Sequence, residues 1–152
     1  MEQLNWQCLH FNELTIHQLY ALGVLRQDVF VVEQNCPYLD FDNKDQKCWH
    51  VLVTNQEGEL LAYTRLVPLG ISYPNDVAIG RVITSSKARG TGLGRPLMRR
   101  SMEYCKKLWG ETNIRLSAQK HLEHYYNSVG FVSTTKEYLE DGIPHIEMYH
   151  NY

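Results

Sequence analysis

The sequence predicts an α+β fold built around one mixed β-sheet, and three observations favour it. The chain has 152 residues, which is enough for one well-formed core and too few for two ordinary domains. Hydrophobic residues make up 43% of the chain and charged residues 21%, as in soluble globular domains. Strand-like and helix-like patterns alternate throughout, without a linker, a repeat or a low-complexity tract. We therefore expect residues 1–152 to form a single domain.

The first half of the chain predicts one helix and four strands. Apolar residues recur at helical spacing between Thr15 and Arg26, and Asn12 or Thr15 is a suitable N-cap. Residues 33–45 lack periodicity and carry turn residues, which indicates an acidic loop. A hairpin is expected where two β-rich runs flank the turn at residues 55–58. The expected strands are residues 6–10, 49–54, 59–67 and 77–84.

The second half predicts two helices and three further strands. Apolar residues at three- and four-residue steps run from Leu93 to Trp109 and indicate a helix that lies on a sheet, which Gly110 ends. A shorter helix is expected at residues 120–129. The expected strands are residues 113–118, 131–137 and 146–149. The resulting order, β α ββ β α β α ββ, is typical of an α+β chain.

Charge and cysteine content narrow the partners that we expect. The formal net charge is −2, from 15 Lys and Arg against 17 Asp and Glu, so no overall basic field favours nucleic acid or an anionic membrane. No window approaches the run of about 18 apolar residues that a membrane span needs, and we expect a soluble, cytoplasmic protein. The 4 cysteines form no CxxC pair, which favours reduced thiols over a disulfide framework or a thiolate zinc site.

The stretch ARGTGLGRP at residues 88–96 places three alternating glycines between two arginines. It joins a predicted strand to a predicted helix, and the first N–H groups of a helix lack intrahelical partners and carry partial positive charge. Glycine lets the backbone approach an anion closely, and Pro96 marks the point where helical hydrogen bonding begins. The stretch therefore predicts a phosphate-binding loop. A glycine-rich turn that binds nothing is the alternative.

The spacing of the loop excludes two common nucleotide motifs. A dinucleotide fingerprint GxGxxG needs glycine at position 95, where the chain has Arg95, and the Gly-Lys-Ser/Thr of a Walker loop is absent. Residues 89–94, RGTGLG, instead resemble the R/Q-x-x-G-x-G/A signature of the GNAT superfamily of acyl-CoA-dependent N-acyltransferases. Residues 116–131, LSAQKHLEHYYNSVGF, are similar to the later motif of that family, in which a tyrosine precedes Gly-Phe by four residues.

A narrower resemblance spans nearly the whole chain. The segments VVEQNCPY (31–38), IGRV (79–82), LSAQ (116–119) and DGIPH (141–145) are together similar to the ElaA-like branch of the superfamily. The resemblance implies a single-domain fold whose central mixed β-sheet is flanked by helices on both faces. It also implies an acetyl-CoA-dependent N-acetyltransferase, whose partners are acetyl-CoA and an amine of a small molecule or a protein. The acceptor itself is not specified.

The resemblance assigns the donor site to the glycine loop and its neighbours. The backbone amides of the loop would hold the pyrophosphate of coenzyme A, with the guanidinium groups of Arg89 and Arg95 at its edge. The main chain at residues 82–84 would pair with the pantetheine arm, and Gln119 falls where many members have an asparagine that contacts this arm. The predicted donor-binding residues are Val82, Ile83, Thr84, Arg89, Gly90, Thr91, Gly92, Leu93, Gly94, Arg95 and Gln119.

Tyr126 is the predicted catalytic residue. In the family, the matching tyrosine lies near the thioester sulfur and donates a proton to the departing thiolate. Without the resemblance, Tyr126 would be one of 10 tyrosines and more simply a packing residue, and the spacing to the Gly-Phe pair favours it over Tyr125. The implied reaction is direct attack of an amine on the thioester, with the oxyanion held by a backbone N–H near Ile83 or Thr84. Such a reaction needs no nucleophilic cysteine.

The general base is left unassigned. An aliphatic amine has a pKa near 10.4, so it must lose a proton before it can attack. The residues 77–84 contain no glutamate, unlike the corresponding strand of members that place their base there. The candidates are Glu33, His50, His145 and Glu147, and a structural or surface role is the alternative for each.

Two further clusters of polar residues carry weaker predictions. Asp40, Asp42 and Asp45 predict a solvated loop, and attraction of a cationic amine is the alternative. Their spacing lacks the central glycine and the terminal glutamate of a calcium loop. His121 and His124 can share a helix face but have no evident third ligand, so we expect no metal site.

Two classes of function stay open at this point. The first is the N-acetyltransferase, which the presence of Tyr126 favours. The second is a catalytically weak acyl-CoA-binding regulatory module that acts through a partner, which the lack of an obvious base keeps open. The sequence does not fix the oligomeric state, and a homodimer is one option.

Overall fold

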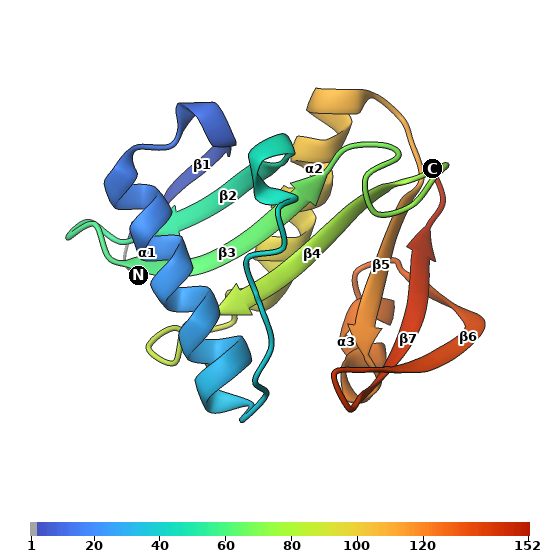
Figure 1. The fold of residues 1–152 in the computed structure, drawn as a ribbon. Coiled ribbons are helices and arrows are strands. Elements are labelled where there is room, and N and C mark those ends of the chain that lie inside the picture. The colour runs from blue at the N-terminus through green and yellow to red at the C-terminus, as the bar shows by residue number, and fades with distance from the viewer. Residues whose placement is uncertain (1–2) are drawn as a thin grey trace.

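One mixed sheet of seven strands organises the computed structural model, which describes residues 3–152 (Figure 1). The strand order across the sheet is β1-β2-β3-β4-β5-β7-β6. Neighbouring strands are antiparallel except β4 and β5, which are parallel. The strands are β1 Asn5–His10, β2 Trp49–Thr54, β3 Leu60–Val67, β4 Val77–Thr84, β5 Ile114–Gln119, β6 Val132–Glu140 and β7 Ile143–His150.

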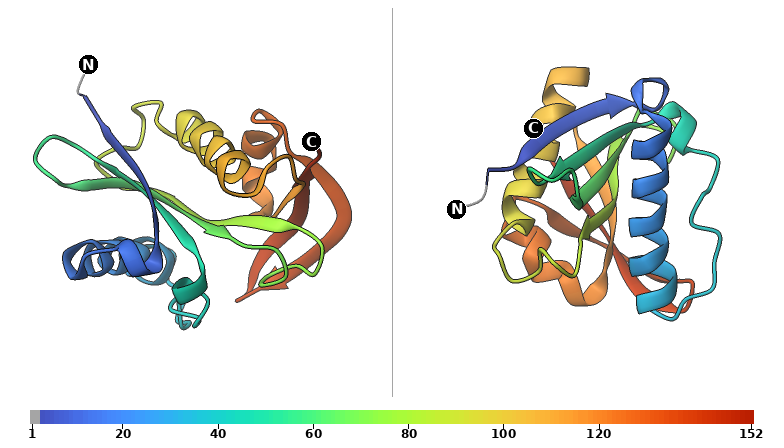
Figure 2. Two further views of the ribbon diagram at one scale, coloured as in Figure 1. Left: turned by 90° about the horizontal axis from the view of Figure 1, so that it is seen from above. Right: turned by 90° about the vertical axis from the view of Figure 1, so that its left-hand side faces the viewer.

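Helices cover both faces of the sheet (Figure 2). On one face, α1 Ile16–Arg26 continues directly into a π-helix, η2 Gln27–Glu33. On the other face lie α2 Gly94–Trp109 and the short α3 Glu123–Asn127. The single-turn 3-10 helices are η1 Phe11–Glu13, η3 Asp45–Lys47 and η4 Lys120–Leu122. None of the helices between residues 3 and 152 is long and apolar enough to cross a membrane.

Each face of the sheet has its own core. The larger core lies between the sheet and the pair α2 and α3, and it includes Leu97, Met98 and Phe131. The smaller core lies under α1, where Leu22 and Leu25 pack against the sheet. Thr15 begins α1 as predicted, because its hydroxyl accepts from the N–H of Gln18 while the Gln18 side chain accepts from the N–H of Thr15.

The parallel strands β4 and β5 touch only at their first residues and then diverge (Figure 1). Val77 pairs with Ile114 and Ala78 pairs with Arg115, and no pairing follows along the rest of the two strands. A bulge also bends β4, because the register with β3 shifts at this point and Arg81 has a φ of 50°. The divergence and the bulge leave an opening in the middle of the sheet.

The predicted order of strands and α-helices is confirmed, and the boundaries differ by more than one residue in three places. The helix expected to end at Arg26 continues as a π-helix to Glu33. The helix expected at residues 120–129 is split into η4 and α3. The last two strands are longer than predicted, because a tight turn at Asp141 and Gly142, both with positive φ (51° and 77°), allows β6 and β7 to pair along most of their length.

Candidate active site

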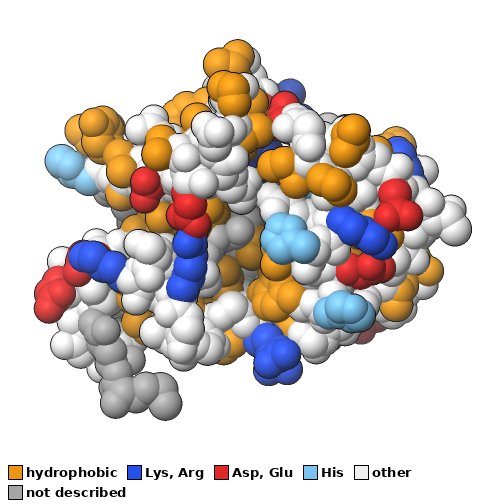
Figure 3. Space-filling view, turned by 90° about the horizontal axis from the view of Figure 1, so that it is seen from below, with side chains coloured by type: hydrophobic (Ala, Val, Ile, Leu, Met, Phe, Trp, Pro, Cys, Tyr) orange, Lys and Arg blue, Asp and Glu red, His pale blue; other side chains and the backbone are white. Residues whose placement is uncertain are grey.

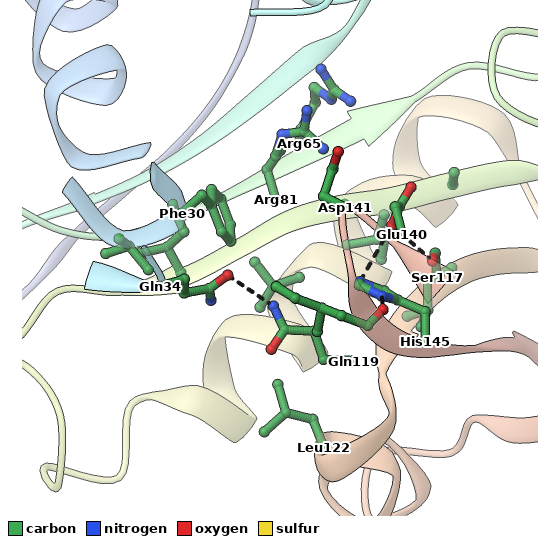
Figure 4. Close-up of a pocket in the computed structure, with 18 of the residues that line it drawn as sticks. Phe30, Gln34, Arg65, Arg81, Ser117, Gln119, Leu122, Glu140, Asp141 and His145 are labelled. Atoms are coloured by element: carbon green, nitrogen blue, oxygen red, sulfur yellow. Dashed lines mark hydrogen bonds and ion pairs between the residues drawn. The ribbon is translucent and has the colours of Figure 1, made fainter. Parts of the chain in front are cut away.

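A cavity of about 680 Å³ lies where β4 and β5 diverge. Its walls come from β4, β5, the β6–β7 hairpin and the segment after η2 (Figure 4). Seen from below, the molecule is hollowed here, with apolar side chains inside and charged side chains and histidine near the rim (Figure 3). A second cavity, of about 400 Å³, lies between the glycine loop and Tyr125. Both cavities are lined by Thr84 and Arg89, so they adjoin at the end of β4.

The glycine loop presents unpaired backbone N–H groups at the start of α2. Gly90 and Gly92 have φ values of 79° and 82°, a conformation that residues with side chains rarely adopt. Within residues 3–152, no group accepts a hydrogen bond from the backbone N–H of Gly90, Gly92, Leu93, Gly94 or Arg95. Because α2 has 16 residues, its dipole adds positive potential at this end. The arrangement suits the oxygens of a phosphate.

The other predicted loop residues maintain the shape of the loop or lie at its edge. The N–H of Arg89 donates to the carbonyl of Ser85 at 3.1 Å, and the N–H of Thr91 donates to the carbonyl of Ala88 at 3.3 Å, so these two amides are already used. The guanidinium of Arg89 also forms an ion pair with Glu33. At the other end, Nε of Arg95 donates to the hydroxyl of Ser128 at 3.1 Å.

Residues 82–84 form the edge of β4 that borders the larger cavity. The side chain of Ile83 packs into the core under α1, whereas Val82 packs against the core on the opposite face. Because both side chains are committed to cores, the strand offers its main chain to a ligand in the cavity. Across the opening, Nε2 of Gln119 at the end of β5 donates to Oε1 of Gln34 at 3.2 Å (Figure 4).

The adjacent tyrosines Tyr125 and Tyr126 have different surroundings. The hydroxyl of Tyr125 donates to the carbonyl of Gly94 at 2.7 Å and so holds the first turn of α2. Tyr126 is 6% exposed, packs edge-on against Phe131 and lines the larger cavity. Burial raises the pKa of Tyr126, so the phenol keeps its proton. A buried, protonated hydroxyl group beside a cavity can donate a hydrogen bond to a ligand there.

The aspartates of the predicted acidic loop are paired with arginines. Arg26 is 0% exposed, and it donates to Asp40 at 2.6 Å and to Asp45 at 2.8 Å. Arg65 donates to both carboxylate oxygens of Asp42, at 2.8 and 2.9 Å. The prediction of a solvated loop is therefore wrong, and the carboxylates are also not free to attract an amine. The physical reason is that buried arginines of α1 and β3 form ion pairs with the aspartates of the loop.

The same network reaches the bulge in β4. Nε of Arg81 donates to Oδ1 of Asp40 at 2.7 Å, so Asp40 joins α1 to β4. Burial by itself would raise the pKa of Asp42, but the hydrogen-bonded guanidinium of Arg65 outweighs it and lowers this pKa to about 2. A signal for this network is present in the sequence, because Arg65 and Arg81 interrupt apolar strands, where an arginine requires a buried partner.

Comparison with known proteins identifies the family. A family profile described as "Acetyltransferase (GNAT) domain" matches residues 29–151, which include the cavity walls, the glycine loop and both tyrosines. The chain belongs to the GNAT acetyltransferase family. It is similar to Protein ElaA of Escherichia coli (strain K12), with 46% identity over 147 residues that cover 95% of each chain.

Solved structures place the chain in the ElaA-like branch of the GNAT family. An acyl-CoA N-acyltransferase from Pseudomonas aeruginosa has a TM-score of 0.91 and 47% identity, covering 97% of this chain and 99% of that one. The crystal structure of Escherichia coli ElaA has a TM-score of 0.90 and 44% identity, covering 98% of this chain and all of that one (100%). The predicted single-domain GNAT fold, with its central mixed sheet and flanking helices, is confirmed.

Two candidate bases of this GNAT domain lie outside the cavity. His50 is 0% exposed, with its ring between the Tyr63 hydroxyl at 2.6 Å and the Asp45 carbonyl at 3.0 Å. Burial lowers the pKa of His50, which has a structural role in the core. Glu147 is bound by Arg115 at 3.0 Å and does not border the cavity. Neither side chain is placed to take a proton from a ligand.

The other two candidates, Glu33 and His145, line the cavity. The hydrogen-bonded guanidinium of Arg89 lowers the pKa of Glu33, which makes this carboxylate a weaker base. His145 is 8% exposed, and its ring hydrogen-bonds through Nδ1 to the carbonyl of Ile143 at 2.7 Å. The structure thus places His145 in the same cavity as Tyr126, residues 82–84 and Gln119.

The sequence did not single out several polar residues around His145. Ser117, Tyr138 and Glu140 border the cavity from β5 and β6. One signal was available for Ser117, because it alternates with the buried Leu116 and Ala118 along β5 and so faces the other side of the sheet. Among the residues that the structure describes, no group of three or more His, Cys, Asp or Glu side chains is arranged to hold a metal ion.

Proposed function

We propose that this GNAT protein is an N-acetyltransferase that transfers an acetyl group directly from acetyl-CoA to a primary amine of a small molecule or a protein. Family membership supplies the acetyltransferase class. The observation that carries the proposal is the row of unpaired N–H groups at the start of α2, beside a cavity that contains the buried Tyr126.

The residues of the site fit a coenzyme A thioester. Phosphate oxygens need several donors, and the N–H groups of Gly90, Gly92 and Leu93 to Arg95 would supply them. The exposed main chain at residues 82–84 would bind the pantetheine arm through backbone hydrogen bonds. The amide of Gln119 would contact this arm by exchanging its bond to Gln34. The cavities adjoin, so one extended ligand can occupy both.

The side chains of the site have separate tasks in the proposed reaction. The bound donor supplies an acyl group that is already activated as a thioester. Tyr126, kept protonated by burial, gives its proton to the sulfur that departs. A backbone N–H of β4 near Ile83 or Thr84 stabilises the oxyanion. Arg89 and Arg95, one on each side of the glycines, add positive charge beside the phosphates.

A second candidate is the catalytically weak acyl-CoA-binding regulatory module. Three of the four candidate bases, namely Glu33, His50 and Glu147, are held in structural pairs, and this observation favours it. Such a module would keep the loop and bind acyl-CoA without turnover. The net charge of −2 gives no support for nucleic acid or an anionic membrane as a partner of either candidate.

Calorimetric titration with acetyl-CoA tests the donor site. We expect the wild-type protein to bind at sub-millimolar concentration. Gly92→Glu should abolish binding, because its carboxylate would occupy and repel the phosphate position. Gly70→Glu is the matched control, since Gly70 has a φ of 86° and an equally open Cβ position on a different loop, but contacts neither cavity. Equal affinity for all three proteins would overturn the phosphate-loop assignment.

Release of free thiol from acetyl-CoA then separates the enzyme from the module. The protein is incubated with a panel of primary amines, and product formation is confirmed by mass. Amine-dependent thiol release is expected from the enzyme. Tight binding of acetyl-CoA without release above the rate of hydrolysis, over the whole panel, would contradict the enzyme and leave the module.

A further inference from the structure

The β6–β7 hairpin and β5 bring a cluster of polar side chains to one wall of the larger cavity (Figure 4). Oε2 of Glu140 lies 3.3 Å from Nε2 of His145 and accepts from the hydroxyl of Ser117 at 3.4 Å. The hydroxyl of Tyr138 is hydrogen-bonded to Ser117, and its ring stacks on His145 with centroids 6.0 Å apart. The cluster therefore holds the imidazole in place from two sides.

This cluster lies on the face of the sheet opposite Tyr126. Along β5, Leu116 and Ala118 belong to the core that contains Tyr126, so Ser117 and Gln119 point to the other face. His145 is the partner of Gln119 in the antiparallel pairing of β5 with β7 and shares that face. Since the opening between β4 and β5 connects the two faces, a reacting group in it can meet Tyr126 on one side and His145 on the other.

The hydrogen bonds of His145 fix which ring nitrogen can exchange a proton. Nδ1 lies 2.7 Å from the carbonyl oxygen of Ile143, and because a carbonyl can only accept, Nδ1 carries a hydrogen. The lone pair of the neutral ring is therefore on Nε2, next to Glu140. An imidazole held in this tautomer is suited to taking a proton at Nε2 while the neighbouring carboxylate stabilises the positive charge.

Four carboxylate residues line the cavity, and Glu140 and Asp141, unlike the other two, are not paired with an arginine within the described residues. Asp42 is held by Arg65 through both oxygens, and Glu33 is paired with Arg89. Within residues 3–152, no lysine or arginine pairs with Glu140, and the basic group that contacts its carboxylate is Nε2 of His145 at 3.3 Å. The negative charge of Glu140 is therefore available to a cationic ligand. This part of the cavity favours an acceptor that arrives as an alkylammonium ion.

We propose that His145, positioned by Ile143 and Glu140, is the general base that deprotonates an alkylammonium acceptor. This inference rests on the proposed acetyl transfer. A proton of the ammonium moves to Nε2 of His145, and the freed lone pair forms the N–C bond to the acyl carbon while the C–S bond breaks. Tyr126 gives its hydroxyl proton to the departing sulfur and recovers one, through solvent, from the new amide nitrogen.

The step balances without a redox partner. The proton on His145 leaves through Glu140, whose side chain is 54% exposed. One proton is thus released to solvent for each amide formed, and the acyl group is neither oxidised nor reduced. Tyr138 is a poor alternative base, because burial raises its pKa and keeps its hydroxyl protonated. His121 also lines the cavity, but it is exposed, and within the described residues no hydrogen bond orients it.

Two acceptors of different basicity distinguish a general base from a residue with only a structural role, and so test the assignment of His145. Benzylamine is mostly an ammonium ion at neutral pH and must lose a proton, whereas benzoic hydrazide is mostly neutral and need not. His145→Gln should lower kcat/KM for benzylamine by about a hundredfold, the range of general-base catalysis, and for benzoic hydrazide by less than about tenfold. Glu140→Gln should show the same selectivity with a smaller loss. The calorimetric affinity for acetyl-CoA should stay unchanged in both variants.

Matched histidine variants and a spectroscopic measurement complete the test. His124→Gln, on the exposed part of α3 and away from the cavity, should behave as wild type. Equal losses with both acceptors, or a selective loss in His121→Gln but not in His145→Gln, would overturn the assignment. So would an imidazole ¹⁵N spectrum of the neutral ring, assigned with His145→Gln, that puts the hydrogen on Nε2. If the wild-type protein acetylates neither acceptor nor any other amine, the proposed function itself fails.

Discussion

The two sides of the adjoining cavities are built in different ways. The side proposed to bind the donor is a run of consecutive residues, 88–96, in which two glycines adopt positive φ and five backbone N–H groups have no acceptor among the described residues. The opposite side is assembled from side chains of β5, β6 and β7. Nearby, ion pairs hold the loop that carries Asp40 and Asp42 to arginines of α1, β3 and β4. A site made from backbone groups can be predicted from a short sequence motif. A site made from side chains of several strands depends on how those strands pair.

The ion-pair network also affects the shape of the larger cavity. Arg81 occupies the bulge of β4 with a φ of 50°, a conformation that costs a residue with a side chain about 1 kcal/mol. Its bond to Asp40 offsets this cost and holds the bulge where the cavity begins. Single substitutions in the ion-pair network are therefore expected to lower stability. In the loop at residues 88–96, we expect such sensitivity only at the glycines.

The largest effect is expected from Asp40→Ala in the buried network. The change leaves the fully buried Arg26 with the carboxylate of Asp45 alone, and it leaves Arg81 with only its longer carboxylate contact, to Asp42 at 3.5 Å. Breaking a buried ion pair on one side costs about 3–5 kcal/mol, and we expect a loss of about 3 kcal/mol in the free energy of unfolding by urea. Asp28→Ala, exposed on η2 and without an ion-pair partner between residues 3 and 152, should change it by less than about 0.5 kcal/mol. Equal stability of the two variants would contradict a structural role for the network.

The next largest effect is expected from Tyr126→Phe, which sharpens the distinction between the adjacent tyrosines. Loss of the proton donor should lower kcat by about a hundredfold and leave the Kd for acetyl-CoA within about twofold. Tyr125→Phe removes the hydrogen bond to Gly94 and should instead weaken acetyl-CoA binding by several-fold, equivalent to about 1 kcal/mol. Full activity of Tyr126→Phe with a good acceptor would refute its assignment as proton donor.

A smaller effect is expected in the pH dependence of stability. The pKa of Asp42 is lowered from 3.8 to about 2 in the folded protein, so its contribution to stability is present above the unfolded pKa and is lost as pH falls through the folded one. The free energy of unfolding should therefore decrease between about pH 4 and about pH 2. In Asp42→Asn this part of the curve should be flatter. An identical slope for the variant and the wild type would show that Arg65 does not stabilise the ionised carboxylate.

The sequence predicts the local structure around the glycine loop well for a physical reason. A strand, a glycine turn and a long helix with Pro96 in its first turn are local features, and their geometry depends little on the rest of the chain. The order of strands and helices was likewise readable, because apolar residues in α2 and β5 follow the periods of a helix and a strand.

The rest depends on contacts that no local pattern contains. Asp40 and Asp45 look like solvated loop residues until Arg26 and Arg65 are known to lie beneath the loop. The setting of His145 likewise depends on the pairing of β5 with β7 and on the turn that brings Glu140 beside it. The structure shows the neighbours of these residues because it defines the register of the paired strands. The sequence alone does not specify that register.

Amide hydrogen exchange at residues 90–95, measured with and without saturating acetyl-CoA, tests the central claim most directly. The N–H groups of Gly90, Gly92, Leu93, Gly94 and Arg95 have no acceptor among the residues described, so they should exchange rapidly in the free protein. Donor binding should protect them, while the amides of Gly70 and Ile71, which already donate to the carbonyls of Tyr73 and Pro68, should exchange at the same rate with and without the donor. Unchanged rapid exchange of the whole loop under conditions where calorimetry shows bound acetyl-CoA would contradict the account.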